Sequence, residues 1–161
     1  MNRPVREFNQ GAYDSCDSPC KQALVSMMES RGYELIGDPD GEYYKNYDML
    51  FVKQPTGERI AFENEMRENY DMIKNVYSSI HIPIRKKVSK SNYYVVWNYA
   101  MDEFALISMN TIRELASHHT VEIFCKARNG RPAYSESFID VPKEFVTFYM
   151  KATPTTWKAI K

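Results

Sequence analysis

A chain of 161 residues is long enough to bury a substantial core and short enough for one domain. Hydrophobic residues make up 43% of it and aromatic residues 14%, a composition that excludes a disordered protein. Lys plus Arg and Asp plus Glu are equal at 21 each, and a net charge of zero argues against a protein that coats nucleic acid through a broadly basic surface.

Residues 1–17 are polar and are predicted to form an irregular N-terminal arm. They lack the apolar core of a secretory signal, and no run of 18 apolar residues follows, so we expect a cytoplasmic protein without a membrane span. The odd number of cysteines, three, agrees with reduced thiols. Cys16 and Cys20 have the spacing of half a zinc site, but no second Cys or His pair matches it, so we predict no zinc centre.

The first predicted helix spans residues 19–31, with Ser18 as its N-cap and Gly32 at its C-terminal end. Its apolar residues recur at helical spacing and define one buried face: Cys20, Ala23, Leu24, Met27 and Met28. A short strand over residues 33–36 and a turn over residues 37–41 are expected next.

The following segment carries a group of acidic side chains on a predicted β-hairpin. Residues 47–53 and 59–67 have the pattern of two strands, joined by a turn at residues 54–57. Asp48 opens the first strand, and Glu63 and Glu65 stand near the end of the second. Because residues two apart on a strand point to the same face, Glu63 and Glu65 should project together, with Asp48 nearby. Three carboxylates so placed repel one another unless a cation or a proton lies between them.

A second helix is predicted over residues 67–77 from the helical spacing of its apolar residues. Residues 80–87 are then expected to be extended, with Pro83 restricting them to a sheet edge or a bend. Basic residues dominate the end of this segment and form a basic strip: Arg85, Lys86, Lys87 and Lys90. Two interpretations of the strip stay open, a solvated loop that protects an edge strand and a contact for the phosphates of a nucleic acid.

The strongest strand signal lies at residues 93–98, a continuous aromatic and β-branched run that is typical of a central strand. The remaining predicted elements are a strand at 104–108, a helix at 110–116 capped by Asn110, strands at 120–126 and 138–141, and a strand or helix at 144–150. Residues 151–161 are expected to be a C-terminal tail whose Trp157 docks on the domain. The prediction is a single α/β domain over residues 18–150, with a mixed central sheet flanked by helices and C-terminal β additions. Assembly into a homo-oligomer stays open.

The acidic group suggests a chemistry. Asp48, Glu63 and Glu65 together would offer the hard oxygen ligands that Mg²⁺ or Mn²⁺ prefers. Such a cation activates water and neutralises the charge that develops on a phosphate during hydrolysis. The alternative is an ordinary solvated face on which Glu65 pairs with Arg67 or Arg59.

Over roughly residues 18–100 the chain resembles the PD-(D/E)xK nuclease superfamily in the order of its predicted elements. These are a helix, a strand, a hairpin of an Asp-bearing strand with a strand that carries paired acids, a second helix and a central strand. This resemblance implies the restriction-endonuclease-like fold with its αβββαβ core. It further implies a Mg²⁺- or Mn²⁺-dependent endonuclease that hydrolyses phosphodiester bonds of DNA or another nucleic acid. Asp48 then matches the motif's Asp and Glu63 its second acid, and Glu29 matches an additional carboxylate that many members carry in the first helix.

Two positions depart from the motif. Tyr47 stands where the family has Pro, and Glu65 stands where the family has the Lys that orients or activates the attacking water. A few restriction enzymes of the superfamily also carry Glu there, and Arg67 or Lys86 is the candidate to supply the missing positive charge.

The resulting hypothesis assigns a role to each residue. Asp48 and Glu63 bind the cation, and Glu65 holds a second cation or orients the water. The basic residues contact phosphate, with Lys86 also in the catalytic set: Arg67, Arg85, Lys86 and Lys87. Two alternatives stay open: a catalytically inactive module of the same fold that binds nucleic acid or a protein, and an accessory protein of a phage, other virus or mobile element whose acids are only surface groups.

Overall fold

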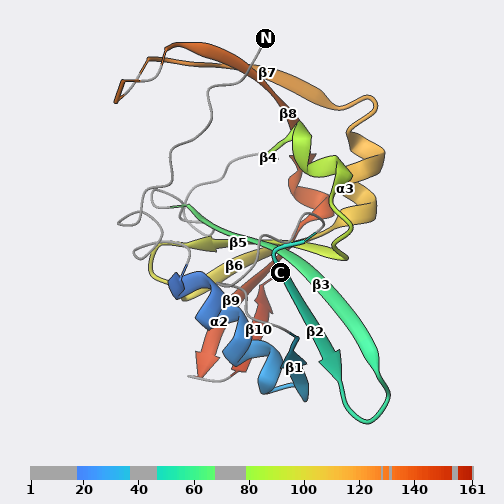
Figure 1. Ribbon diagram of the computed structural model, residues 1–161. Coiled ribbons are helices and arrows are strands. Elements are labelled where there is room, and N and C mark those ends of the chain that lie inside the picture. The colour runs from blue at the N-terminus through green and yellow to red at the C-terminus, as the bar shows by residue number, and fades with distance from the viewer. Residues whose placement is uncertain are drawn as a thin grey trace.

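Two β-sheets lie one above the other in the computed structural model, which describes residues 18–36, 47–67, 79–127, 129–130, 132–153 and 156–160 (Figure 1). The larger sheet has seven strands in the order β1-β2-β3-β5-β6-β9-β10, and the smaller has three in the order β4-β8-β7. The strands of the larger sheet are β1 (Tyr33–Leu35), β2 (Met49–Lys53), β3 (Glu58–Arg67), β5 (Tyr93–Asn98), β6 (Glu103–Ser108), β9 (Thr147–Thr153) and β10 (Thr156–Ile160). The smaller sheet consists of β4 (Ser79–Pro83), β7 (Thr120–Cys125) and β8 (Tyr134–Pro142). The helices of the described ranges are α2 (Ser18–Glu29), α3 (Met109–Leu115) and the 3₁₀ helices η2 (Ile84–Val88) and η3 (Lys143–Phe145).

Helix α2 covers one face of the seven-stranded sheet (Figure 1). It confirms the helix predicted near residues 19–31, and the predicted apolar face is buried at Cys20, Leu24, Met27 and Met28. Gly32 follows with a φ of +84°, the left-handed conformation that favours glycine, and its N–H bonds to the carbonyl of Glu29 at 3.0 Å. The chain therefore leaves the helix at Gly32 and enters β1 directly.

The predicted acidic hairpin is present as β2 and β3, which pair antiparallel from Met49 opposite Phe62 to Lys53 opposite Glu58. Gly57, with a φ of +72°, completes the turn. β3 then pairs in parallel with β5, from Phe62 beside Tyr93 to Arg67 beside Asn98. A parallel pair needs a crossover connection, and β4 and η2 lie on the one between β3 and β5. The larger sheet is therefore mixed, as predicted.

β5 is the central strand that its sequence predicts, because every residue from Tyr94 to Asn98 is buried. Trp97 packs against Trp157 of β10 with ring centroids 5.2 Å apart. β10 lies three strands away from β5, a separation of about 14 Å on a flat sheet. The contact between the two rings therefore shows that the sheet curls at this end.

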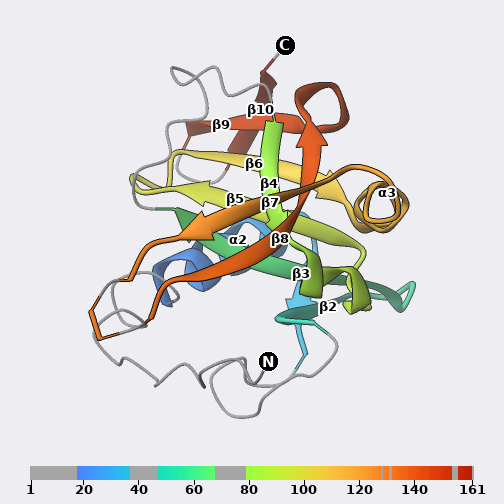
Figure 2. The same ribbon diagram turned by 90° about the horizontal axis from the view of Figure 1, so that it is seen from above.

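The smaller sheet covers the other face of the larger one, with its strands crossing over those beneath (Figure 2). Its inward side chains, Ile80, Ile82, Ile139 and Val141, are fully buried in the same core. The prediction of a sheet flanked by helices is thus met on the α2 face. On the opposite face, the described residues form a second sheet with η2 and α3 at its side (Figure 2).

Several predicted elements differ from the structure. The extended segment at 80–87 ends at Pro83, and Ile84–Val88 turns into η2. Asn110 does not cap α3, which begins at Met109, and its side chain instead accepts a hydrogen bond from Arg113 at 2.9 Å. Residues 144–150 contribute to η3 and the strand β9. The predicted tail is mostly strand, because β9 runs to Thr153 and β10 pairs with it, although Trp157 docks as expected.

Three predictions fall wholly or largely outside the described residues, one of them the turn over residues 37–41. The N-terminal arm lies wholly outside them, and the helix at 67–77 does so except for Arg67, which belongs to β3. Among the described helices, none is both long and apolar enough to cross a membrane.

Candidate functional site

The two glutamates of β3 project from the face of the sheet that is turned away from α2. Asn64 lies between them in sequence and points to the helix side, where its amide donates to Cys20 Sγ at 3.4 Å and its Oδ1 accepts from Trp97 Nε1 at 2.7 Å. Because strand residues alternate in direction, Glu63 and Glu65 share the opposite face. The predicted common projection of these two side chains is therefore present.

Glu63 is the centre of this group. Only 4% of the residue is exposed, an unusual position for a carboxylate. Its Oε2 forms an ion pair with Nζ of Lys86 from η2, and its Oε1 accepts a hydrogen bond from Ser89 Oγ at 2.7 Å. The buried charge is thus compensated by one cation and one hydroxyl.

The pKa values of this ion pair reflect a shared field of several charges. Burial and the neighbouring charge of Asp48 raise the pKa of Glu63, and Lys86 and Ser89 offset this effect only in part. Burial lowers the pKa of Lys86, but the charges of Asp48, Glu63 and Glu65 outweigh it and hold that pKa above its ordinary value. All three predicted carboxylates therefore act on the same lysine.

Asp48 precedes β2 and anchors the end of the hairpin. Its backbone N–H bonds to the carbonyl of Phe62 at 3.0 Å, and its Oδ2 accepts from the backbone N–H of Asn64 at 3.0 Å. Within the described ranges its Oδ1 has no hydrogen-bond partner. The residue is half-buried, and its Oδ2 holds the end of the hairpin together.

Glu65 is paired with a cation of its own strand. Arg67 donates to Glu65 Oε1 through Nε at 2.9 Å and through Nη2 at 2.7 Å, and Nη2 also bonds to the carbonyl of His81 at 2.7 Å. Tyr94 lies on the neighbouring strand β5, and its burial and the charge of Glu65 raise the pKa of Tyr94 well above its ordinary value. The pairing with Arg67 that the sequence left open is thus present.

The loop that holds Ser89 against Glu63 was not predicted from the sequence. Arg113 of α3 donates through Nη2 to the backbone carbonyls of Ser89 at 2.7 Å and Ser91 at 3.0 Å. Because the single hydroxyl proton of Ser89 goes to Glu63, Ser89 Oγ accepts from Ser91 Oγ at 3.0 Å, and both serines are buried. No pattern in the sequence links these three positions, because the contact depends on how α3 packs beside η2.

The other predicted residues lie further from Glu63. Arg85 is exposed and approaches Glu136 of β8 at 3.8 Å. Lys87 and Lys90 are exposed and have no ion-pair partner in the part of the chain that the structure describes. Glu29 lies at the exposed C-terminal end of α2, which covers the face opposite to Glu63. The structure therefore gathers Asp48, Glu63, Glu65 and Lys86 and leaves Glu29 apart.

The residues that could take part in holding a divalent cation are Asp48 and Glu63. No group of three or more His, Cys, Asp or Glu side chains among the described residues is arranged to hold a metal ion. Mg²⁺, however, is usually bound by one or two carboxylates, with water and substrate phosphate as further ligands. Asp48 and Glu63 provide two carboxylates whose mutual repulsion a cation relieves.

Comparisons with known proteins gave no match: no protein-family model fits the chain, and no curated protein and no solved structure is significantly similar to it.

Proposed function

We propose that this protein is a nuclease that hydrolyses phosphodiester bonds of nucleic acid with a divalent cation held by Asp48 and Glu63. The observation that carries the proposal is the buried Glu63, whose carboxylate is compensated by Lys86 and repelled by Asp48. Burying a carboxylate beside a second one costs stability. Proteins that keep such an arrangement commonly use it for function.

Lys86 supplies the positive charge that the resemblance to PD-(D/E)xK nucleases requires. In that motif the lysine stands two residues after the second acid, a position that Glu65 occupies here. Lys86 reaches Glu63 from η2, and its ammonium group is within the field of all three carboxylates. The proposed role of Lys86 is to orient the attacking water or to contact the scissile phosphate.

The order of elements supports the same proposal. α2 is followed by β1, β2 and β3 in antiparallel pairing, and β5 then joins β3 in parallel. This order resembles an αβββαβ core, with the difference that β4 of the smaller sheet and η2 come before β5. The second helix of that core is predicted at residues 67–77, which lie outside the described part of the chain except for Arg67 of β3.

A divalent cation at Asp48 and Glu63 would activate water and neutralise the charge that develops on the phosphate. The remaining task of the chain is to hold the substrate near these residues. Lys87 and Lys90 are exposed on either side of Ser89, and neither has an ion-pair partner among the described residues. Together with Arg85 they form the proposed contact for the phosphate backbone.

A cleavage assay tests the proposal directly. Plasmid DNA, single-stranded DNA and RNA are incubated with the protein and Mg²⁺ or Mn²⁺, and products are separated by electrophoresis. Asp48→Asn and Glu63→Gln should each reduce cleavage at least about 100-fold, the effect typical of losing an electrostatic catalytic group. Glu144→Gln, at an exposed position of η3, is the matched control and should cleave like the wild type. Full activity in both site variants would overturn the proposal.

One observation favours a second candidate, a binding module of the same fold without catalysis. Glu65 is already paired with Arg67 and Glu63 with Lys86, so two of the three carboxylates are compensated by cations of the chain itself. Calorimetric titration with Mn²⁺ separates the two candidates. Binding that is lost in Asp48→Asn supports the nuclease, whereas salt-dependent nucleic-acid binding without any Mn²⁺ binding supports the module.

A further inference from the structure

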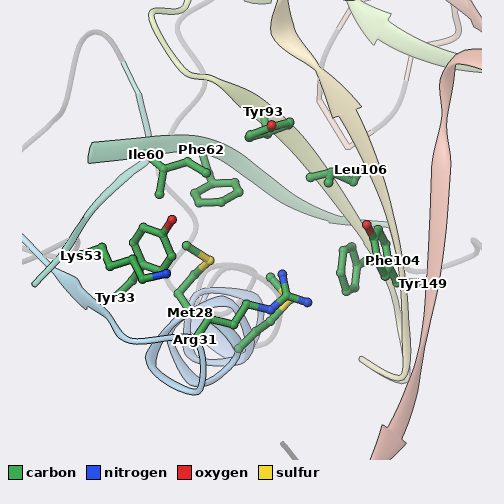
Figure 3. Close-up of a pocket in the computed structure, with 11 residues that line it drawn as sticks. Met28, Arg31, Tyr33, Lys53, Ile60, Phe62, Tyr93, Phe104, Leu106 and Tyr149 are labelled. Carbon is green, nitrogen blue, oxygen red and sulfur yellow. The ribbon is translucent and has the colours of Figure 1, made fainter. Parts of the chain in front are cut away.

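A cavity lies on the α2 face of the seven-stranded sheet, with a volume of about 440 Å³ (Figure 3). Its walls contain five aromatic rings, contributed by Tyr33, Phe62, Tyr93, Phe104 and Tyr149. Phe62 and Tyr93 are stacked with centroids 6.0 Å apart, and Phe104 and Tyr149 are stacked at 4.8 Å with an angle of 11° between their planes. The cavity is therefore bounded by one near-parallel ring pair and by a second pair whose planes are inclined by 30°.

This cavity is separate from the carboxylate site. Phe62 points into it, and its neighbour Glu63 points to the other face of β3. The sheet itself therefore lies between the two sites, and the cavity has no role in the proposed cleavage.

Two cationic side chains line the cavity. Arg31 follows the last turn of α2 and is exposed, and Lys53 ends β2 (Figure 3). Neither forms an ion pair with any described residue. The ammonium group of Lys53 lies 5.3 Å from the centroid of the Tyr33 ring, and the nearby Glu58 accepts the hydroxyl of Tyr33 at 3.2 Å. Glu58 lies opposite Lys53 in the β2–β3 register, but its carboxylate is hydrogen-bonded to Tyr33, so neither cation is held in an ion pair within the described ranges and both can contact an anionic ligand.

We propose that this cavity binds a small planar aromatic molecule that carries a carboxylate or a phosphate. The ring would pack against the aromatic walls, where stacking and edge contacts stabilise it, and the anionic group would lie between Arg31 and Lys53. A volume of about 440 Å³ is within the range of small-molecule sites. The five rings favour a planar aromatic ligand over an aliphatic chain, and the two cations favour an anion over a neutral molecule.

Matched pairs of ligands test this proposal. Adenosine 5′-monophosphate and 2-naphthoate are titrated into the full chain by calorimetry, each beside its uncharged counterpart, adenosine or 2-naphthamide. The two arms distinguish a phosphate ligand from a carboxylate ligand. At least one anion should bind, and its uncharged counterpart should bind at least about tenfold more weakly, because hydrogen bonds to charged groups are the stronger ones.

Charge variants assign the binding to this cavity. Arg31→Met and Lys53→Met keep much of the side-chain length and remove one charge, and each should weaken binding of the anion about five- to tenfold. Lys158→Met, at an exposed position of β10, is the matched control and should bind like the wild type. Binding that does not change in Arg31→Met and Lys53→Met overturns the proposal.

Two other results also overturn it. The first is the absence of binding by both anions, and the second is equal binding of charged and uncharged partners, which would point to an apolar site for a neutral ligand. Loss of nucleic-acid cleavage in Asp48→Asn has no bearing on this test, since Asp48 does not line the cavity.

Discussion

Replacing Lys86 by Met tests whether the buried ion pair with Glu63 is a real source of stability. The Glu63 side chain is 6% exposed and that of Lys86 is 28% exposed, so the substitution leaves a carboxylate uncompensated in a nearly dry environment. Removing one partner of a buried pair costs about 3–5 kcal/mol. Because Lys86 is partly exposed and Ser89 still donates to Glu63, we expect a smaller loss of about 2–3 kcal/mol at pH 8.

The loss should depend on pH in a defined direction. The pKa of Glu63 is already raised in the folded protein, and without Lys86 it rises further. A carboxyl group with a raised folded pKa favours folding more strongly as the pH falls, because the folded state then takes up the proton. The cost of Lys86→Met should therefore shrink as the pH falls through the raised pKa of Glu63, and the double variant with Glu63→Gln should recover most of the stability at pH 8.

Urea unfolding followed by far-UV circular dichroism at pH 8 and pH 5 measures these differences. A loss of about 2–3 kcal/mol corresponds to a fall in Tm of about 4–12 °C for a chain of this size. Lys158→Met should change the free energy of unfolding by less than about 0.5 kcal/mol, as surface substitutions usually do. An equal cost at both pH values, or a cost below about 1 kcal/mol at pH 8, would refute the reasoning.

Three further predictions concern the surroundings of this pair. Arg113→Met leaves the buried carbonyls of Ser89 and Ser91 without their guanidinium donor, so the free energy of unfolding should fall by about 1–3 kcal/mol; a change under 0.5 kcal/mol in urea unfolding contradicts this. Asn64→Ala deprives the indole N–H of Trp97 of its acceptor and should cost about 1–3 kcal/mol, and a Tm equal to that of the wild type argues against the bond. Mn²⁺ affinity should fall by up to about tenfold per pH unit below the raised pKa of Glu63, because proton and cation compete for the same carboxylate; calorimetry that finds the same affinity at pH 8 and pH 5 excludes Glu63 as a ligand.

Elements with a strong local signal were predictable from the sequence. The alternating direction of strand residues was enough to place Glu63 and Glu65 on one face, and the apolar run at residues 93–98 was enough to predict a buried central strand. Gly32 after α2 and Gly57 in the β2–β3 turn were also predictable, because the chain reverses there with a positive φ that favours glycine.

Contacts that depend on tertiary packing were not predictable. Lys86 meets Glu63 only because the chain after Pro83 forms a 3₁₀ helix. The predicted extended conformation of residues 80–87 gives no reason to expect Lys86, and not Lys87, at Glu63. Arg113 lies 22 residues beyond Ser91, and no periodicity connects the two. The C-terminal strand β10 was missed because its short segment, residues 156–160, has little signal apart from its pairing with β9.

The contact between Trp97 and Trp157 has a consequence for spectroscopy. The chain contains two tryptophans, and both belong to this one cluster, with ring centroids 5.2 Å apart. Intrinsic tryptophan emission therefore monitors only the place where β10 folds back onto β5. Circular dichroism averages over both sheets, so coincidence of the two transitions indicates that they unfold as one cooperative unit. An emission change at lower urea concentration would instead identify β10 as the strand that detaches first.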